Sequence, residues 1–334
     1  MAGDDIVRWG ILSTAHIGMA LVTPAIQAAD NCAVVALASR EKTRARAAAD
    51  QLGIETAYGT YEQLIADPDI DAIYNPLPNH LHLPWTVAAA EAGKHVLCEK
   101  PIGLTSAEAR TIAATAESTG VKIMEAFMYR FHPTWAAVRD IVASGRIGPI
   151  QVIQAWFSYF NDDPANIRNV AEWGGGALMD IGCYPINVSR MLFGAEPTVV
   201  GATMTHDPSS GVDIVTTALL QFPTGVAAFT CATQLESDQR VHIYGRDGRI
   251  SVEIPFNVPS DRPTRIFVTQ GGDPPVAPAV ETLSFDPADQ YSLQARAFAA
   301  AVLDDVPVPL PLADSIANMT VIEEIVASAA SNAG

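Results

Sequence analysis

The stretch Ile6-Val-Arg-Trp-Gly-Ile-Leu-Ser-Thr-Ala-His-Ile-Gly18 decides the fold of this 334-residue chain. Its first half, Ile6–Leu12, is a short apolar run typical of a strand buried on both faces. The second half keeps the spacing of a G-x-G-x-x-G turn, in which backbone N–H groups at a helix N-terminus face a pyrophosphate. Ser13 and Ala15 replace two glycines, but small side chains still allow close approach, and Ser13 adds a hydroxyl donor. The other turn residues expected to contact a nucleotide are Thr14, His16 and Ile17.

Taken alone, this motif fits an ordinary strand–turn–helix as well as a nucleotide site, so the surrounding pattern matters. Strand-like and helix-like segments alternate over the first third of the chain. The expected strands are Ile6–Leu12, Ala33–Ser39, Ala72–Asn75, His95–Glu99 and Val121–Met124. The expected helices are Ile17–Ala29, Lys42–Leu52, Tyr61–Ala66, Leu81–Ala92 and Ser106–Ser118, with Gly53, Gly93 and Gly120 as C-terminal caps. Alternation of this kind predicts a doubly wound parallel sheet, the Rossmann dinucleotide-binding fold, over residues 1–124.

From residue 125 onward the pattern changes to longer strand-like runs. After a helix at Pro133–Ser144, these runs are Gln151–Phe160, Thr198–Thr205, Ile214–Phe222, Val226–Thr233, Arg240–Tyr244, Arg249–Ile254 and Arg265–Thr269. Phe222–Gly225 and Gly245–Gly248 read as hairpin turns. Only one clear helix, Gly176–Phe193, interrupts the series. We expect an α+β domain with a large, mainly antiparallel open sheet over 125–311 for substrate and oligomerisation, and a C-terminal helix within 312–334.

The composition restricts the class of partner. A net charge of −17 argues against nucleic acid and anionic membranes, which both require clustered cations. No apolar run reaches the ~18 residues of a membrane span. The acidic start, Met1–Asp5, leads into a strand and is not a secretory signal, so we expect a cytoplasmic protein. The four cysteines lack metal-type spacing and read as reduced, partly buried thiols; no metal is expected.

The end of the second expected strand indicates the nucleotide. An acid that binds the ribose 2′-hydroxyl of NAD would stand here, about 20 residues after the glycine turn, but Ser39 and Arg40 occupy these positions. Arg40, with further cations behind it, suits a 2′-phosphate through charge-assisted hydrogen bonds. Glu41 is the nearest carboxylate and is expected to point away. NADP(H) is therefore favoured, while an ordinary exposed arginine at a helix start remains the alternative.

Asn75-Pro-Leu-Pro-Asn-His-Leu-His82 follows the third expected strand, at the carboxyl edge where such sheets bind ligands. Pro76 and Leu77 lie in a loop fixed by prolines and are expected to line the cofactor. Asn79 either contacts the cofactor or caps the next helix. His82, on the first turn of that helix, is a cofactor candidate or a structural histidine.

Lys100 lies in Cys98-Glu99-Lys100-Pro101, at the same edge, before a proline that rigidifies the turn and could be cis. The lysine is expected to point toward a nicotinamide in the cleft, where a neighbouring cationic ring and burial would lower its pKa. Glu99 either binds the nicotinamide ribose or pairs with a basic neighbour.

Asp180 and Tyr184 follow Gly174-Gly-Gly176 on one expected helix, four residues apart and therefore on one face. A phenol has an ordinary pKa near 10, too high for a general base at neutral pH. An ammonium nearby favours the phenolate. We therefore expect Tyr184 to be the acid/base, Lys100 its electrostatic partner, and Asp180 the residue that orients a substrate hydroxyl. A buried aromatic residue and a helix-start aspartate remain the alternative.

Three motifs carry a resemblance to a known family. Glu99-Lys-Pro101, Glu125-Ala-Phe-Met-Tyr-Arg-Phe-His-Pro133 and Gly174-Gly-Gly-Ala-Leu-Met-Asp-Ile-Gly-Cys-Tyr184 resemble the glucose-fructose oxidoreductase, inositol dehydrogenase and rhizopine catabolism (Gfo/Idh/MocA) family. Many members carry histidine where Tyr184 stands. Tyrosine there, and Asn166-Ile-Arg168, resemble the subgroup with glucose-fructose oxidoreductase, dimeric dihydrodiol dehydrogenase and NADP-dependent xylose dehydrogenase.

The resemblance implies further site residues. Arg168 would lie near the cofactor, and Met128 and Tyr291 would line the nicotinamide side. Residues of the second domain would form the wall of the substrate pocket, with Tyr159, Phe160 and Arg168 as candidates. The open face of the large sheet is apolar enough to suggest burial against a second subunit, in a homodimer or homotetramer.

These features together predict an NADP(H)-dependent oxidoreductase that acts on a sugar or sugar-like polyol, as an aldose dehydrogenase or a keto-sugar reductase. Two other functions are compatible with the same fold. One is an NAD-dependent glycosidase that uses hydride transfer only transiently. The other is a non-catalytic NADP-sensing regulator, which would not require Lys100, Asp180 and Tyr184 together.

Overall fold

The computed structural model describes residues 6–271 and 279–332, and the acidic start Met1–Asp5 lies outside this part. The chain divides into two units. The first comprises Met1–Met128 and Gln290–Ile316, and the second comprises Tyr129–Asp289 and Ala317–Gly334. The expected boundary at residue 124 lies close to the observed one, but Gln290–Ile316 joins the first unit instead of the second.

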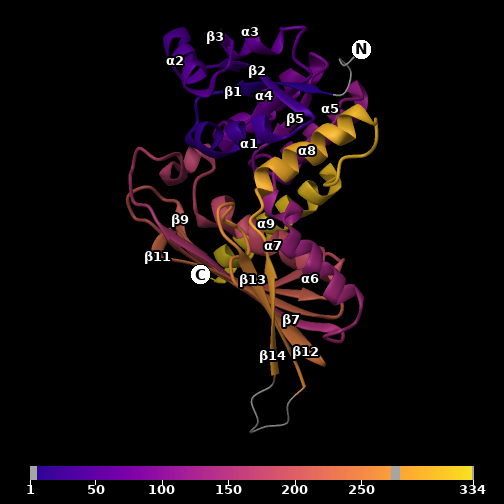
Figure 1. The fold of residues 1–334 in the computed structure, drawn as a ribbon. Helices are drawn as coiled ribbons and strands as arrows, with labels where there is room; N and C mark the ends of the chain where they lie inside the picture. Colours follow the sequence, from indigo (N-terminus) through magenta and orange to yellow (C-terminus); the bar gives the residue numbers. More distant parts are fainter. Residues whose placement is uncertain (1–5, 272–278, 333–334) are drawn as a thin grey trace. The chain divides into compact units, whose positions relative to one another are not determined.

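The first unit contains the expected parallel sheet (Figure 1). Its strands, in spatial order, are β3 (Thr56–Tyr58), β2 (Cys32–Ala38), β1 (Val7–Leu12), β4 (Ala72–Asn75), β5 (His95–Cys98) and β6 (Ile123–Glu125). This is the doubly wound order, in which the crevice for a dinucleotide opens at the carboxyl ends of β1 and β4. Because both faces are covered, β4 is buried at every residue.

Helices connect these strands. They are α1 (Thr23–Ala28), which a π-helical segment at Gly18–Val22 precedes, α2 (Lys42–Leu52), α3 (Tyr61–Ile65), α4 (His82–Glu91) and α5 (Ser106–Thr119). Gly53 and Gly120 are left-handed C-caps, as expected. α4 ends at Glu91, one residue earlier than expected. Its C-cap is therefore Ala92, and Gly93 follows the cap.

A helix that the sequence analysis did not predict, α8 (Gln290–Leu303), packs in the first unit. Phe298 on α8 contacts Trp9 of β1 with ring centroids 5.4 Å apart, and both side chains are fully buried. Alanines and two buried glutamines, Gln290 and Gln294, weaken the apolar periodicity of this segment. The segment was therefore left without an expected element, whereas the one helix expected to interrupt the strand-like runs, Gly176–Phe193, corresponds to α7 and the π-helical segment before it.

The second unit contains the expected large, mainly antiparallel sheet. In spatial order its strands are β14 (Ala279–Phe285), β13 (Thr264–Gln270), β12 (Gly248–Val252), β11 (Gln234–Gly245), β7 (Ile150–Phe160), β10 (Gly225–Ala232), β9 (Asp213–Phe222) and β8 (Thr198–His206). Among the described strands of this second sheet, only the pair β7–β10 is parallel. β14 was not predicted, because its residues are mostly exposed and its apolar residues are interrupted by Glu281, Thr282 and Ser284.

One face of this sheet carries the core of the second unit. Ile153, Ala155 and Phe157 of β7 point to that face and are buried. The helices of the unit are α6 (Pro133–Ala143), α7 (Cys183–Phe193), which a π-helical segment at Leu178–Gly182 precedes, and α9 (Leu312–Asn332), whose residues from Ala317 onward belong here. Asn318 of α9 donates to the carbonyl of Cys183 at 3.2 Å.

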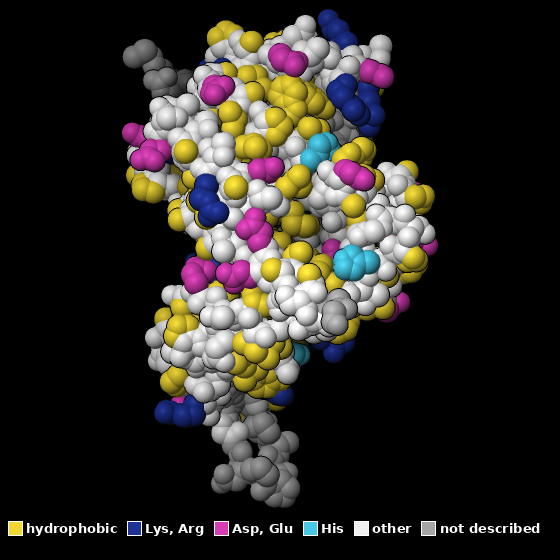
Figure 2. All heavy atoms as spheres, turned by 180° about the vertical axis from the view of Figure 1, so that it is seen from behind, with side chains coloured by type: hydrophobic (Ala, Val, Ile, Leu, Met, Phe, Trp, Pro, Cys, Tyr) yellow, Lys and Arg dark blue, Asp and Glu magenta, His cyan; other side chains and the backbone are white. Residues whose placement is uncertain are grey.

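The distribution of the cations and the state of the cysteines are in line with what the composition indicated. On the face shown in Figure 2, lysine and arginine side chains occur in small separate groups. All four cysteines are free and buried. Among residues 6–271 and 279–332, no helix combines the length and apolar character needed to cross a membrane, and no cluster of three metal-binding side chains occurs.

Candidate active site

The turn after β1 has the backbone that a nucleotide site requires. Ser13 adopts a left-handed conformation, φ +70°, which is usually reserved for glycine. Its Oγ accepts the N–H of Ala15 at 3.2 Å, and its O–H can still donate to a phosphate. Met19 N–H bonds to the carbonyl of Ala15, so the helix starts directly at the turn. The turn therefore presents a helix N-terminus at the carboxyl edge of β1, and it fits a pyrophosphate despite the missing glycines.

The cations that follow β2 lie where a 2′-phosphate would be bound. Ser39 is buried and donates its N–H to the carbonyl of Tyr58, whereas Arg40 and Arg44 are exposed. Burial raises the pKa of Tyr61, and the charges of Arg40 and Arg44 oppose this rise, so both guanidinium groups lie near this ring. Arg46, by contrast, is already paired with Asp50 at 2.8 Å.

The loop after β4 is held by internal hydrogen bonds. Asn75 is buried, accepts the N–H of Leu77 at 3.3 Å and donates to Thr86 at 3.1 Å. Pro76 and Leu77 are buried as well. Asn79 opens a 3-10 turn, and the N-cap of α4 is Leu81, so Asn79 does not have the capping role considered for it.

His82 has a structural role. Its ring is buried, with Nδ1 2.7 Å from the carbonyl oxygen of Pro101 and Nε2 2.6 Å from that of Leu77. A neutral imidazole donates through one nitrogen only, so one contact is a hydrogen bond and the other a close approach. Burial lowers the pKa of His82 to about 4, which keeps the ring neutral. The imidazole links two loops and offers neither ring nitrogen to a cofactor.

The turn that carries Lys100 is fixed on both sides. Lys100–Pro101 is a cis peptide, as the sequence allowed. Before it, Glu99 accepts the hydroxyl of Tyr74 at 2.7 Å. After it, buried Glu125 accepts the N–H of Ile102 at 2.8 Å. The half-buried Lys100 is thus held on a well-defined turn at the carboxyl edge of β5.

Tyr291 of α8 reaches the same part of the first unit. Burial raises the pKa of Tyr74 well above its usual value, and the charges of Glu99 and Tyr291 act in the same direction. Tyr291 therefore lies near the Tyr74–Glu99 pair. Met128, the other residue named by resemblance, is buried in a 3-10 turn at Met128–Phe131.

In the second unit, the predicted residues Asp180, Tyr159 and Arg168 form one network. Asp180 Oδ2 accepts the hydroxyl of Tyr159 at 2.5 Å and Nε of Arg168 at 2.9 Å. Burial, followed by the charge of Asp180, raises the pKa of Tyr159. The charge of Asp180 raises the pKa of the Arg168 guanidinium against the effect of burial, and the phenols of Tyr159 and Tyr184 add to the rise. Arg168 therefore lies within electrostatic range of Tyr184.

Tyr184 is fixed by aromatic packing. Its side chain is buried, and its ring centroid lies 5.2 Å from Phe256, 5.6 Å from Phe157 and 5.8 Å from Tyr129. Asp180 itself lies in the π-helical segment that leads into α7. Phe160, also named for the pocket wall, is 63% exposed at the end of β7.

Sequence analysis missed several residues that shape these two sites. Glu125 and Asn75 hold the loops of the first unit, and Phe256 packs on Tyr184. Glu125 had a signal, because it is a carboxylate directly after the expected apolar strand Val121–Met124, at the edge of the sheet where ligands bind. Phe256 had none, because it lies in a loop far from Tyr184 in sequence.

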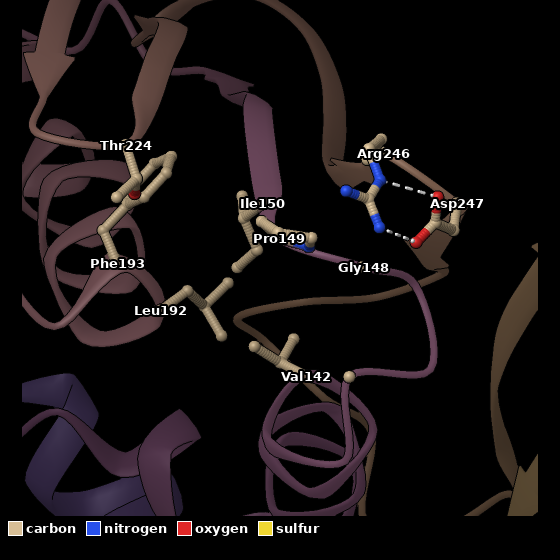
Figure 3. A pocket seen from close by; sticks show the side chains of 10 residues that line it. Val142, Gly148, Pro149, Ile150, Leu192, Phe193, Thr224, Arg246 and Asp247 are labelled. Carbon is tan, nitrogen blue, oxygen red and sulfur yellow. Dashed lines mark hydrogen bonds and ion pairs between the residues drawn. The ribbon is translucent and has the colours of Figure 1, made fainter.

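A separate surface pocket of about 450 Å³ lies in the second unit (Figure 3). It is lined by Val142, Ile150, Leu192 and Phe193, and by Arg246, which pairs with Asp247 at 2.9 Å. None of the residues predicted for catalysis or cofactor binding lines it.

Comparison with known proteins follows the two units. Residues 7–127 match the model of the NAD-binding Rossmann fold of the GFO/IDH/MocA oxidoreductases, and residues 135–251 match the GFO/IDH/MocA C-terminal domain. The chain is 47% identical over 326 residues to an uncharacterized oxidoreductase, ORF334, of Rhizobium meliloti, covering 97% of both chains. It is 39% identical over 330 residues to D-xylose 1-dehydrogenase (NADP(+)) 2 of Haloferax volcanii, covering 98% of both.

Among solved structures, the chain is similar to KijD10, a 3-ketoreductase from Actinomadura kijaniata in complex with NADP and TDP-benzene. The TM-score is 0.90 at 30% identity, and the match covers 97% of this chain and 98% of that one.

Proposed function

The chain belongs to the Gfo/Idh/MocA family of oxidoreductases, and from this premise we propose that it transfers a hydride between NADP(H) and a sugar or sugar-like polyol. The substrate is either an aldose or polyol whose hydroxyl is oxidised, or a keto-sugar whose carbonyl is reduced. The observation that carries the proposal is the construction of the Lys100 turn, which Glu99 and Glu125 hold through Tyr74 and Ile102. The similarity to an NADP-dependent xylose dehydrogenase supports the sugar and the cofactor.

The first unit would hold the cofactor. The helix N-terminus at Ser13–Gly18 binds the pyrophosphate, and Arg40 binds the 2′-phosphate. When bound, NADP(H) supplies or accepts the hydride at its nicotinamide. Lys100, and the loop that contains Pro76 and Leu77, would line the nicotinamide end, because both follow strands next to the crevice.

Tyr184 would transfer the proton. In oxidation, the substrate hydroxyl gives its proton to the Tyr184 phenolate while the hydride leaves the carbon that carries this hydroxyl. In reduction, the Tyr184 phenol gives a proton to the carbonyl oxygen of the substrate. The ordinary phenol pKa of ~10 is too high for this work at neutral pH. Two cations counter it: the guanidinium of Arg168 in the same unit, and the ammonium of Lys100, which also stabilises developing charge on the substrate oxygen.

Asp180 would orient the substrate hydroxyl. Its carboxylate is held by Tyr159 and Arg168, both within hydrogen-bond distance of Oδ2. Two charge-assisted hydrogen bonds fix the group before the substrate arrives, and this preorganisation lowers the cost of aligning the reacting hydroxyl.

A second copy of the chain would cover the open face of the large sheet. Trp156 of β7 and Leu219 of β9 point to this face and are 36% and 39% exposed. Between them lies a hydrogen-bonded pair, Thr217 and Thr230. A two-fold dimer would bring this same face of two copies together.

A substrate screen tests the proposed activity. Aldoses, inositols and keto-sugars are offered with NADP(H) and with NAD(H), and the absorbance of the reduced nicotinamide is followed. We expect net turnover with NADP(H). Cleavage of a glycoside with flat absorbance would identify a glycosidase instead, and NADPH binding without turnover on the whole panel would identify a regulator.

Two variants test the residues. Lys100→Ala and Tyr184→Phe should each lower kcat by roughly 100- to 10,000-fold, the range of general acid–base catalysis, while NADPH affinity changes far less. Lys122→Ala and Tyr244→Phe are matched controls; Lys122 pairs with Asp305 and Tyr244 lies on β11. Turnover close to that of the unaltered enzyme in either active-site variant would refute the assigned role.

A further inference from the structure

The segment before Tyr184 approaches its neighbours so closely that two positions cannot hold a side chain. Gly176 has φ +112°, and a Cβ there would lie 2.0 Å from Oδ1 of Asp213. A Cβ on Gly182 would lie 2.8 Å from Sγ of Cys231. Because Asp213 begins β9 and Cys231 lies on β10, the start of the helix rests directly on these two strands.

Asp213 anchors this contact with hydrogen bonds. Its side chain is buried, and its Oδ2 accepts the N–H of Leu178 at 2.8 Å and the hydroxyl of Thr216 at 2.6 Å. Thr216 is itself completely buried. A single carboxylate oxygen thus ties the first residue of the π-helical segment Leu178–Gly182 to β9.

The negative charge of Asp213 is favourable at the N-terminus of this helix. A carboxylate at a helix N-terminus is stabilised by the unpaired N–H groups and by the helix dipole. Burial raises the pKa of Asp213, whereas the bonds from Thr216 and Leu178 and the charge of His206 oppose the rise. The carboxylate has exchanged solvent for a fixed set of donors, so its position is determined by the fold.

The anchored residue controls where the site residues point. Asp180 lies in the π-helical segment that starts at Leu178, and Tyr184 follows in the first turn of α7. A rotation or shift of the helix at Leu178 would move both side chains together. Asp180 would then lose its alignment with Tyr159 and Arg168, which come from other elements.

We propose that Asp213 is a positioning residue for proton transfer. It fixes the rotation of the helix that carries Asp180 and Tyr184, and the position of that helix along its axis. The proposal rests on the proposed role of Tyr184 as the acid/base. It assigns a function to a residue that lies outside the proposed proton-transfer pair, and it explains why glycine stands at position 176.

Three variants and one control separate positioning from general stability. Asp213→Asn keeps an oxygen that can accept both bonds. Thr216→Val removes one bond, and Asp213→Ala removes both. Asp207→Ala is the control, because Asp207 is a carboxylate of the same unit that also accepts backbone N–H groups, from Ser209 and Ser210, outside the site.

The variants are compared in kcat, in its pH profile and in NADPH affinity. A readout that needs no turnover is the ultraviolet titration of the Tyr184 phenol, taken as the difference from Tyr184→Phe. Asp213→Ala should lower kcat by roughly 10- to 100-fold, the cost of misplacing a catalytic group by about 1 Å, and it should shift the phenol titration. The kcat of Thr216→Val should lie between those of Asp213→Ala and the unaltered enzyme. The kcat of Asp213→Asn should stay within about threefold of that of the unaltered enzyme.

The proposal is overturned if Asp213→Ala, or Thr216→Val where the alanine variant does not fold, changes kcat and the phenol titration no more than Asp207→Ala does. Equal losses in Asp213→Asn and Asp213→Ala would also overturn it, because the retained oxygen would then not matter. If the unaltered enzyme turns over no substrate, the proposed function fails, and the phenol titration still decides the role of Asp213.

Discussion

Acid is expected to destabilise the second unit through His132, the N-cap residue of α6. The ring is buried, and its Nδ1 accepts the N–H of Thr134 at 3.2 Å. Nε2 finds no hydrogen-bond partner among the described residues. Burial lowers the pKa of this imidazole from 6.5 to about 4. A protonated ring could no longer accept the N–H of Thr134, so acid would also remove the cap.

The sign and size of the expected change in the free energy of unfolding follow from the difference between the folded and unfolded pKa of His132. Above the unfolded pKa of ~6.5 neither state binds the proton, and the stability is fully present. As the pH falls from 6.5 to about 4, the unfolded state takes up a proton that the folded state excludes, so the free energy of unfolding decreases. A shift of about 2.5 pKa units at 1.36 kcal/mol each gives a loss of roughly 3 kcal/mol. His82 acts in the same direction, so the unaltered protein loses more than this single amount.

His132→Asn isolates the contribution, because asparagine is a good N-cap and does not titrate. Urea unfolding is followed by tryptophan fluorescence at about pH 7 and at about pH 4.5, and the free energy of unfolding is compared between variant and unaltered protein. The variant should lose about 2–3 kcal/mol less on acidification. The contribution of His82 to this loss is the same in both proteins and cancels in the comparison. Equal acid losses in the two proteins would refute the reasoning.

Two further predictions concern the cofactor and the assembly. Arg40→Ala should weaken NADP(H) binding by roughly 10- to 100-fold, the value of a charge-assisted hydrogen bond, and NAD(H) binding by no more than about twofold. Isothermal titration of both cofactors measures this, with Arg46→Ala as the control, and equal losses for both cofactors would contradict the 2′-phosphate site. Trp156→Glu and Leu219→Glu should each lower the mass in light scattering from that of the proposed dimer to that of a monomer, since a charge would be buried at the proposed interface. Val306→Glu, at a position of the first unit that is 46% exposed, is the control; an unchanged mass in both sheet variants would remove this face as the interface.

The pattern of buried strands was readable because it is local. A parallel strand covered on both faces needs a nearly continuous apolar run, and β1, β2, β4 and β5 all have one. The cis turn at Lys100–Pro101 and the caps at Gly53 and Gly120 were also readable, because proline and glycine act on their own backbone. β3 has only three residues and β14 is mostly exposed with an interrupted apolar pattern, so neither gave such a signal.

The partners of the site residues could not be read in the same way. The sequence indicated that Asp180 and Tyr184 share a helix, but it did not indicate that Asp180 bonds to Tyr159 and Arg168. Both partners come from other elements, and their distance from Asp180 depends on strand register. His82 is a second example, since its two carbonyl neighbours belong to loops that meet only in the folded first unit.

The sequence by itself determined the two kinds of sheet, the nucleotide turn and the residue types available for proton transfer, because these depend on the periodicity and conformation of neighbouring residues. Only the tertiary structure decided that α8 packs on β1, that Phe256 fixes Tyr184, and that Asp213 anchors the helix that carries it. The physical reason is that each of these contacts joins segments far apart in the chain. Packing and hydrogen-bond geometry select such contacts only after the strands have taken their register.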